Sequence, residues 1–278
     1  MQRTPSKRSL RGERTELMQF MKGEYNMGRI IAIANQKGGV GKTTTAINLS
    51  ACLAEKGKKV LAVDIDPQGN MTSGLGLEKE AVDKTIYDLM IGDASIDDVI
   101  YKEVIENLDI LPTDINLSGA EIELIGTDNK EFIIRNEVHK VKDQYDFIII
   151  DCPPALSVLT INAMTTADSV LVPIQCEYYA LEGLSQLIHT IELVKERLNP
   201  DLEMEGVVFT MYDARTNLSL QVVENVKDNL NQTIYKTIIP RNIRLAEAPS
   251  YGMPINKYDS KSTGADSYRR LAEEVINK

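Results

Sequence analysis

The feature that most limits how this chain can fold is a glycine-rich turn between an apolar run and a helical segment. The run RIIAIAN (29–35) leads into QKGGVGKTTT, and residues 42–56 then carry small and apolar side chains at helical spacing until Gly57. Glycines let the backbone turn tightly and bring its N–H groups close to phosphate oxygens, and a helix start adds its positive dipole end. This strand–turn–helix context predicts a phosphate-binding loop.

Short apolar runs alternate with helical patterns along the rest of the chain. Helical segments are expected near 117–124, 130–143, 157–166 and 180–198, and six apolar runs complete the predicted strand set: RIIAIAN, KKVLAVDID, NLDILPT, YDFIIIDCPP, ADSVLVPIQ and EGVVFTMYD. Strands that read as continuous apolar runs between helices indicate a parallel sheet covered on both faces. We therefore predict a three-layer α/β fold, with residues 28–278 as one domain.

Composition narrows the class of protein. The chain has 278 residues, 43% hydrophobic and 26% charged, and a formal net charge of −10. No run reaches the ~18 apolar residues that a transmembrane helix needs, and the acidic charge argues against general coating of nucleic acid, although a local basic face remains compatible with it. The three cysteines and two histidines are widely separated, which argues against a zinc site and fits free thiols in a reducing cytoplasm.

The first 27 residues differ from the rest. They are mildly basic and lack the continuous apolar segment of a secretory signal, so we expect an N-terminal extension that is disordered. Met27 lies immediately before the first predicted strand, and a shorter product that starts there is the alternative.

The turn carries the residue types that phosphate binding needs. The ordinary pattern G-x-x-x-x-G-K-[ST] has a glycine where this chain has Gln36. Lys42 is expected to reach the β- and γ-phosphates, Thr43 to hold Mg²⁺, and Thr44 to add hydroxyl and backbone contacts. A second lysine, Lys37, stands at the entrance of the turn, where one cation would already serve a single site. The cradle itself is predicted at Gly38, Gly39, Val40 and Gly41.

Three carboxylates follow predicted strands. Asp64 and Asp66 lie at the end of LAVDIDP, and Asp151 follows the apolar run FIII, a Walker B-like pattern whose aspartate holds Mg²⁺, usually through a water. Ligands of open α/β sheets bind at this edge. Asp64 is either near the metal or a structural cap of its loop. Cys152, next to Asp151, is expected to be a small packing residue.

The stretch KGGVGKTT is a deviant Walker A signature, and with it the chain resembles the ParA/MinD group of ATPases. VDIDPQGN, IIIDCPP, PIQCEYYALEGL, MYDARTN and IPRNIRLAEAPSYG make the resemblance closest to the chromosomal ParA (Soj) partitioning proteins, over residues 28–278. The resemblance implies a P-loop NTPase fold and Mg²⁺-dependent hydrolysis of ATP. It also implies a homodimer that closes around two ATP molecules, in which Lys37 touches the partner's phosphates and Asp66 positions the attacking water. The candidate residues of the Mg²⁺ site are Thr43, Asp66 and Asp151.

The same resemblance implies the remaining contacts. Pro240 and Asn242 match residues that contact adenine, and Met211, on a neighbouring strand end, is the further cofactor-binding candidate. Arg215 and Arg244 match arginines that bind double-stranded DNA without sequence preference. A ParB-type centromere-binding partner would stimulate hydrolysis, and the protein would segregate a chromosome or a plasmid from a cytoplasmic, nucleoid-associated position without binding a membrane.

Two other classes remain open. A MinD-like membrane ATPase needs a C-terminal amphipathic helix with a basic face, whereas this chain ends SYRRLAEEVINK, with Glu273 and Glu274. A redox protein of the nitrogenase-reductase kind needs two cysteines per subunit for a shared iron–sulfur cluster, for which Cys152 and Cys176 are the candidates.

Overall fold

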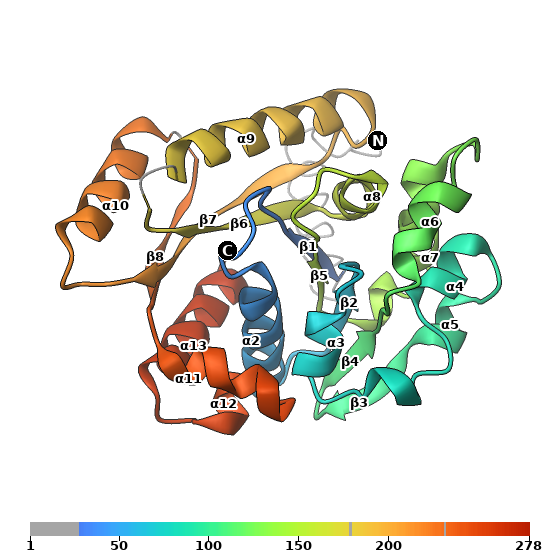
Figure 1. Ribbon diagram of the computed structural model, residues 1–278, viewed down its shortest axis with the longest axis horizontal. Helices are drawn as coiled ribbons and strands as arrows, with labels where there is room; N and C mark the ends of the chain where they lie inside the picture. Colours follow the sequence, from blue (N-terminus) through green and yellow to red (C-terminus); the bar gives the residue numbers. More distant parts are fainter. Residues whose placement is uncertain (1–27, 178–179, 231) are drawn as a thin grey trace, which may run out of the picture.

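The structure is a computed structural model that describes residues 28–177, 180–230 and 232–278. Within these ranges the strands form one eight-stranded sheet, parallel except at β3, which pairs antiparallel to β4 (Figure 1). In sheet order the strands are β3 (Tyr101–Ile105), β4 (Leu108–Leu111), β2 (Val60–Asp64), β5 (Phe147–Asp151), β1 (Arg29–Ile33), β6 (Ser169–Gln175), β7 (Glu203–Tyr212) and β8 (Ile234–Pro240).

Helices cover both faces of this sheet, as Figure 1 shows. They are α2 (Lys42–Glu55), α3 (Asn70–Gly74), α4 (Ile86–Ile91), α5 (Ile96–Val99), α6 (Leu117–Glu123), α7 (Ile133–Val138), α8 (Val158–Thr166), α9 (Ala180–Arg197), α10 (Asn217–Asn229), α11 (Ile243–Glu247), α12 (Ile255–Tyr258) and α13 (Thr263–Ile276). Short 3₁₀ helices are η1 (Lys79–Ala81), η2 (Lys130–Phe132), η3 (Lys142–Gln144) and η4 (Ala248–Tyr251).

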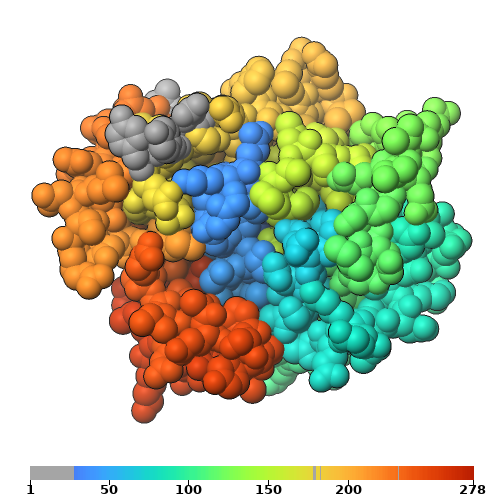
Figure 2. Space-filling view, viewed as in Figure 1, coloured from blue at the N-terminus to red at the C-terminus, as the bar shows by residue number. Residues whose placement is uncertain are grey.

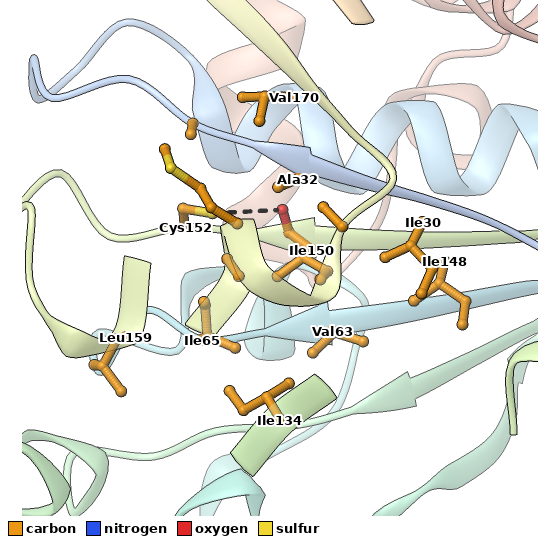
Figure 3. Close-up of a cluster of buried hydrophobic side chains, with 14 of the residues drawn as sticks. Ile30, Ala32, Val63, Ile65, Ile134, Ile148, Ile150, Cys152, Leu159 and Val170 are labelled. Carbon is orange, nitrogen blue, oxygen red and sulfur yellow. Dashed lines mark hydrogen bonds between the residues drawn. The ribbon is translucent and has the colours of Figure 1, made fainter. Parts of the chain in front are cut away.

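The alternation of side chains along the strands builds two cores. On β1, Ile30 and Ala32 pack with α4–α10, whereas Ile31 and Ile33 pack on the other face with α2, α3 and α13. Because both faces are covered, every residue of β2 and β5 is buried. Figure 3 shows part of the first core, where Ile148 and other branched side chains meet. The predicted three-layer α/β fold with a mostly parallel sheet is therefore confirmed.

The predicted set of six strands was incomplete, because β3 and β8 were missed. Both lie at the edges of the sheet, where one side of the strand meets solvent. Their sequences, YKEVI and IYKTIIP, carry charged and polar residues between apolar ones, so they lack the continuous apolar run of a central strand. The helix expected over 130–143 is divided into η2, α7 and η3. The predicted extension at 1–27 lies outside the described residues.

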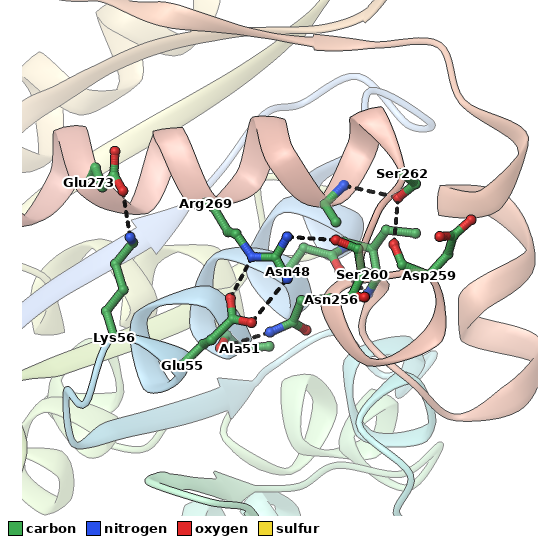
Figure 4. Close-up of polar contacts among 12 residues, drawn as sticks. Asn48, Ala51, Glu55, Lys56, Asn256, Asp259, Ser260, Ser262, Arg269 and Glu273 are labelled. Atoms are coloured by element: carbon green, nitrogen blue, oxygen red, sulfur yellow. Dashed lines mark hydrogen bonds and ion pairs between the residues drawn. The ribbon is translucent and has the colours of Figure 1, made fainter.

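Polar contacts fasten α13 to α2, the helix that follows the glycine-rich turn (Figure 4). Lys56 pairs with Glu273 at 2.6 Å, and the Arg269 guanidinium pairs with Glu55 at 2.8 Å while donating to the Ser260 carbonyl oxygen. The apolar face of α13 is buried beneath these pairs. No helix in the described part of the chain combines the length and the apolar character needed to cross a membrane.

Candidate nucleotide site

The glycine-rich turn leaves β1 and curls over the start of α2 at the carboxyl edge of the sheet. Gly39 and Gly41 adopt φ angles of 73° and 91°, left-handed values that side chains with a Cβ rarely adopt. Gly41 is the N-cap of α2, and no atom lies within 4 Å of where a Cβ on Gly38 or Gly39 would stand. The Thr210 hydroxyl donates to the Val40 carbonyl oxygen at 2.7 Å and ties the turn to β7. The turn is thus an open, fixed backbone cradle at a helix start.

The Lys42 side chain lies beneath this cradle. It is 6% exposed, and its Nζ atom donates to the Lys37 carbonyl oxygen at 3.1 Å. Burial lowers the pKa of Lys42, while the nearby carboxylates of Asp151 and Asp66 act in the opposite direction. Lys42 forms no ion pair within the described ranges. A buried ammonium group without a paired carboxylate is suited to an anion brought in from outside.

Asp151 is the most unusual carboxylate of the site. It is fully buried at the end of β5, and among the described residues neither of its oxygens has a hydrogen-bond partner, although the Thr43 hydroxyl is near enough to favour the charged form. Its strand partner across the sheet is Asp64. Burial raises the pKa of Asp151 well above its usual range, and the charge of Asp64 raises it further. A buried, unpartnered carboxylate is unfavourable unless a cation joins it.

The donor set around Asp151 fits Mg²⁺ rather than zinc. Mg²⁺ binds through one or two carboxylates, hydroxyls and substrate phosphates, and keeps several waters. Thr43 and Asp151 supply a hydroxyl and a carboxylate, whereas no group of three or more His, Cys, Asp and Glu side chains in the described ranges could hold a metal by itself. The residues present therefore fit an ion that shares its ligands with a bound phosphate.

Asp64 and Asp66 have different surroundings. Asp64 is fully buried and accepts hydrogen bonds from the backbone N–H and the hydroxyl of Thr72, both at 2.8 Å. Burial raises the pKa of Asp64 to about 6, against the effect of these hydrogen bonds. Asp66 is 9% exposed and accepts from the N–H of Gln68 at 3.0 Å. Of the two interpretations of Asp64, the contacts favour the cap of the loop, and Asp66 is the less buried of the two carboxylates.

A cavity of about 170 Å³ opens beside the cradle, between the ends of β7 and β8 and α11. It brings together Met211, Pro240 and Asn242, which the sequence grouped only by resemblance. Its full lining is Gly41, Thr44, Thr210, Met211, Ile239, Pro240, Arg241, Asn242, Leu245, Ala246 and Tyr268. Thr210 and Tyr268 were missed, because nothing near them in sequence links them to the turn. Larger grooves, such as one of about 880 Å³ between β8 and α13, have no cradle beside them.

The Lys37 side chain forms an ion pair, whereas the Lys42 amine donates to a backbone carbonyl oxygen. The Lys37 Nζ atom lies 2.5 Å from the Oε2 atom of Glu177, in the segment after β6, and the Lys37 backbone N–H donates to the Asn35 side chain at 2.9 Å. Both charged side chains of the pair are partly exposed. Glu177 was not among the predicted site residues, since 140 positions separate it from Lys37.

Arg215 and Arg244 lie on the exposed surface of different elements. Arg215 precedes α10 and donates to both carboxylate oxygens of Asp213, at 2.8 and 2.7 Å. Arg244, on α11, pairs with Glu247 at 2.9 Å and with Asp259 at 3.6 Å. Each arginine therefore has an acidic neighbour that pairs with its guanidinium group. The hydrogen bonds from Arg215 hold the pKa of Asp213 well below its usual range.

The cysteines of the redox alternative are packing residues. Cys152 is fully buried in the core drawn in Figure 3, where its thiol lies 4.0 Å from the Ile150 carbonyl oxygen, and Cys176 is 6% exposed in the same core. Burial raises the pKa of both thiols, to about 11 for Cys176. Neither sulfur is presented at a surface where a second subunit could share a cluster.

The fold and the site define a P-loop nucleotide-binding protein, and comparisons with known proteins agree. Residues 28–204 match the model of an AAA domain family. The chain is 59% identical over 249 residues to the sporulation initiation inhibitor protein Soj of Bacillus subtilis (strain 168), which covers 90% of this chain and 98% of that protein. It is 51% identical over 257 residues to the chromosome partitioning protein ParA of Myxococcus xanthus (strain DK1622), covering 92% and 91%.

Among solved structures, cobyrinic acid a,c-diamide synthase from Mycobacterium smegmatis, with bound ATP analog and magnesium, is 36% identical and superposes with a TM-score of 0.80 over 90% of this chain and 95% of that chain. The chain therefore belongs to the ParA/Soj family of P-loop ATPases, which confirms the resemblance that its motifs predicted.

Proposed function

We propose that this protein is an Mg²⁺-dependent ATPase that dimerises on ATP, binds DNA without sequence preference, and partitions a replicated chromosome. One observation carries the ATPase proposal. The Lys42 ammonium group has no ion pair within the described ranges, and the Asp151 carboxylate has no hydrogen-bond partner, although both are buried beside the same glycine cradle. A Mg²⁺–triphosphate supplies the missing charge of each.

Each part of the site binds a different part of Mg-ATP. Backbone N–H groups of 38–41 hold phosphate oxygens, and Lys42 neutralises the outer phosphates. Thr43 and Asp151 hold Mg²⁺, which when bound draws charge away from the phosphate oxygens. The cavity beside Met211 receives the base. Asp66, which is less buried than Asp64, accepts a hydrogen bond from the attacking water and orients it.

The dimer proposal rests on Lys37. One lysine per site already neutralises the outer phosphates. The amine of Lys37 pairs with Glu177, whereas the Lys42 Nζ atom donates to the Lys37 carbonyl oxygen. A cation lent to the partner's phosphates stabilises the charge that develops during phosphoryl transfer. In the dimer, Lys37 therefore leaves Glu177 and reaches across the interface, which couples assembly to the γ-phosphate.

The DNA proposal rests on Arg215 and Arg244, whose guanidinium groups are exposed. Dimerisation joins the two weak DNA-binding surfaces of the subunits. Once one surface is bound, the other is held close to the DNA at a high effective concentration, so the dimer binds DNA more tightly than a single subunit. A ParB-type protein bound at a centromere-like site then stimulates hydrolysis and releases the dimer, which places the protein in the cytoplasm on the nucleoid. The apolar face of α13, which includes Tyr268, Leu271 and Val275, is buried against α2 and β8, which disfavours its use as a MinD-like membrane helix.

Co-sedimentation with plain double-stranded DNA tests the proposal. We expect binding with Mg-ATP, no binding with ADP or without nucleotide, and loss of binding in Arg215→Ala and Arg244→Ala. Arg197→Ala, an exposed arginine at the end of α9, is the matched control and should bind like the parent. Light scattering of Lys37→Ala in Mg-ATP should report a monomer. Equal binding with ATP and ADP would contradict the nucleotide switch.

A further inference from the structure

A chain of buried hydrogen bonds joins the carboxyl ends of β2 and β4 through the side chain of Thr72. The Oδ2 atom of Asp64 accepts from the Thr72 hydroxyl and from its backbone N–H, and the Oδ1 atom accepts from the backbone N–H of Asp66 at 3.3 Å. The Thr72 hydroxyl oxygen in turn accepts from the backbone N–H of Thr113, after β4, at 3.1 Å. Asp64, Thr72 and Thr113 are all fully buried.

The Thr72 hydroxyl uses both of its hydrogen-bonding roles at once. It donates to Asp64 and accepts from Thr113. An apolar side chain of the same shape therefore leaves the buried N–H of Thr113 without this acceptor, and Asp64 keeps the backbone N–H of Thr72 but loses the hydroxyl. A serine hydroxyl has the same donor and acceptor and can replace it. The requirement is therefore for a hydroxyl, not for a particular volume.

Asp66 lies in the loop that these hydrogen bonds close. We call the hydrogen bonds that join Asp64, Thr72 and Thr113 the tie. The Asp66 loop starts at Asp64, on β2, and ends at Thr72, on α3, and the tie closes the loop by joining these two residues. The backbone N–H of Asp66 is bonded to the same carboxylate. A shift of Thr72 relative to Asp64 therefore moves the backbone that carries the Asp66 carboxylate.

The helix that bears Thr72 is fixed against the helix of the phosphate turn. A Cβ on Gly74 would come within 2.4 Å of the Ile47 Cδ1 atom, so the Ile47 side chain of α2 packs directly against α3 at this glycine. Gly76 and Gly252 meet in the same way, at 3.0 Å, where α3 passes the segment after η4. The tie thus fixes the position of the Asp66 loop relative to α2, whose first residues are Lys42 and Thr43.

We propose that Thr72 is a positioning residue for ATP hydrolysis: its hydroxyl, acting through Asp64, holds Asp66 where it can orient the attacking water. The proposal rests on the ATPase function proposed above. Thr72 is not among the described residues that line the base cavity, and its hydroxyl is bonded to Asp64 and Thr113, so we expect nucleotide affinity not to depend on it.

The test compares Thr72→Val, Thr72→Ser and Thr166→Val in the full chain. Thr166, at the far end of α8, is also a buried threonine whose hydroxyl is bonded, to the Asn162 carbonyl oxygen at 2.6 Å, and serves as control. We expect Thr72→Val to lower kcat for Mg-ATP about tenfold or more, since small misplacements of reacting groups are costly, with the Kd for ATP unchanged within about twofold. Thr72→Ser should restore kcat, and Thr166→Val should keep it.

Thermal unfolding of each variant separates positioning from loss of fold. If Thr72→Val does not fold, Thr72→Ala removes the hydroxyl with less crowding and should give the same fall in kcat at constant Kd. Parental kcat in either folded variant, a matching loss of ATP affinity, or failure of serine to restore turnover overturns the role of Thr72. A parent chain that binds ATP without hydrolysing it contradicts the proposed function instead.

Discussion

The amine of Lys37 is bound within its own chain, 2.5 Å from the carboxylate of Glu177. The two side chains are 39% and 43% exposed, and exposed ion pairs of this kind contribute only about 0–1 kcal/mol. Such a pair is strong enough to favour one position of the lysine and weak enough to be exchanged for a phosphate. In the proposed function it therefore opposes dimerisation, because the lysine must leave Glu177 before it can serve the partner.

Glu177→Gln should raise the fraction of dimer at limiting Mg-ATP. The neutral amide releases the lysine, so the ATP concentration at half-dimerisation should fall about two- to fivefold, the ratio that corresponds to an exposed ion pair. Light scattering across an ATP titration measures it. Glu273→Gln, which removes the Lys56 pair on α13, is the control and should leave the curve in place. An unchanged or right-shifted curve for Glu177→Gln would count against the restraining role of this pair.

Asp213→Asn should strengthen binding to DNA in the presence of Mg-ATP. Asp213 accepts from both ends of the Arg215 guanidinium, so in the parent a phosphate competes with a carboxylate for the same donors. The variant should bind several-fold more tightly at low salt, with a steeper salt dependence, measured by fluorescence anisotropy of labelled DNA. Asp201→Asn, an exposed aspartate just before β7, should bind like the parent. Weaker binding by Asp213→Asn would show that the aspartate orients Arg215 for DNA.

The central strands and the phosphate turn could be predicted because each is specified by neighbouring residues. FIIID is apolar without interruption since β5 is covered on both faces, and KGGVGKTT contains its own conformational requirements at Gly39 and Gly41. The edge strands were not predicted, because a strand that is exposed on one side does not need an uninterrupted apolar run. In β8, the buried Tyr235 and Thr237 flank the exposed Lys236, which interrupts the apolar run.

The contacts that tune the site could not be predicted, since they join distant parts of the chain. Lys37 meets Glu177 across 140 positions, and Thr72 meets Thr113 across 41. No local period or motif connects such pairs, and only the packing of β6 beside β1 and of β4 beside β2 brings them together. Resemblance grouped Met211 with Pro240, but the fold added Tyr268 to the same cavity.

Glu205→Ala should destabilise the protein more than any exposed substitution on the same strand. Glu205 is 4% exposed and accepts from Arg29, from Ser169 at 2.7 Å and from Tyr235 at 2.6 Å, with Lys278 also paired to it. Removing one partner of a buried ion pair typically costs about 3–5 kcal/mol of unfolding free energy. Urea unfolding measures it, and Glu203→Ala, exposed at the start of β7, is the control. Equal midpoints for the two variants would show that the network adds nothing.

The contribution of Glu205 to the free energy of unfolding should also depend on pH. Burial alone would raise the pKa of Glu205, but hydrogen bonds from Tyr235 and Ser169 and the charges of Arg29 and Lys278 outweigh it, so the pKa is lowered on folding. A carboxyl group with a lowered folded pKa stabilises the protein above its unfolded pKa, about 4.3, and loses that contribution as the pH falls below it. The stability difference between the parent and Glu205→Ala should therefore shrink at pH 4 and below.

Without nucleotide, Asp151→Asn should be more stable than the parent at pH 7.5. In the folded protein, burial raises the pKa of both Asp151 and Asp64, the latter to about 6. The aspartates of the unfolded chain have a pKa of about 3.9, so the folded protein binds protons more readily than the unfolded chain. Their unfavourable contribution to stability therefore grows as the pH rises above about 4, through about 6 for Asp64. The neutral amide removes one buried charge, and we expect a gain in the free energy of unfolding at pH 7.5 that vanishes at pH 4.

Mg-ATP should reverse this order, because a ligand stabilises only the fold that binds it. The parent should gain stability with Mg-ATP concentration, whereas Asp151→Asn, which lacks the carboxylate for Mg²⁺, should gain much less. Urea unfolding at pH 4, 6 and 7.5, with and without Mg-ATP, measures both effects, and Asp143→Asn, an exposed aspartate, should follow the parent throughout. If Asp151→Asn is less stable than the parent without nucleotide and is stabilised equally by Mg-ATP, then the unpartnered carboxylate is structural and not a site for the ion.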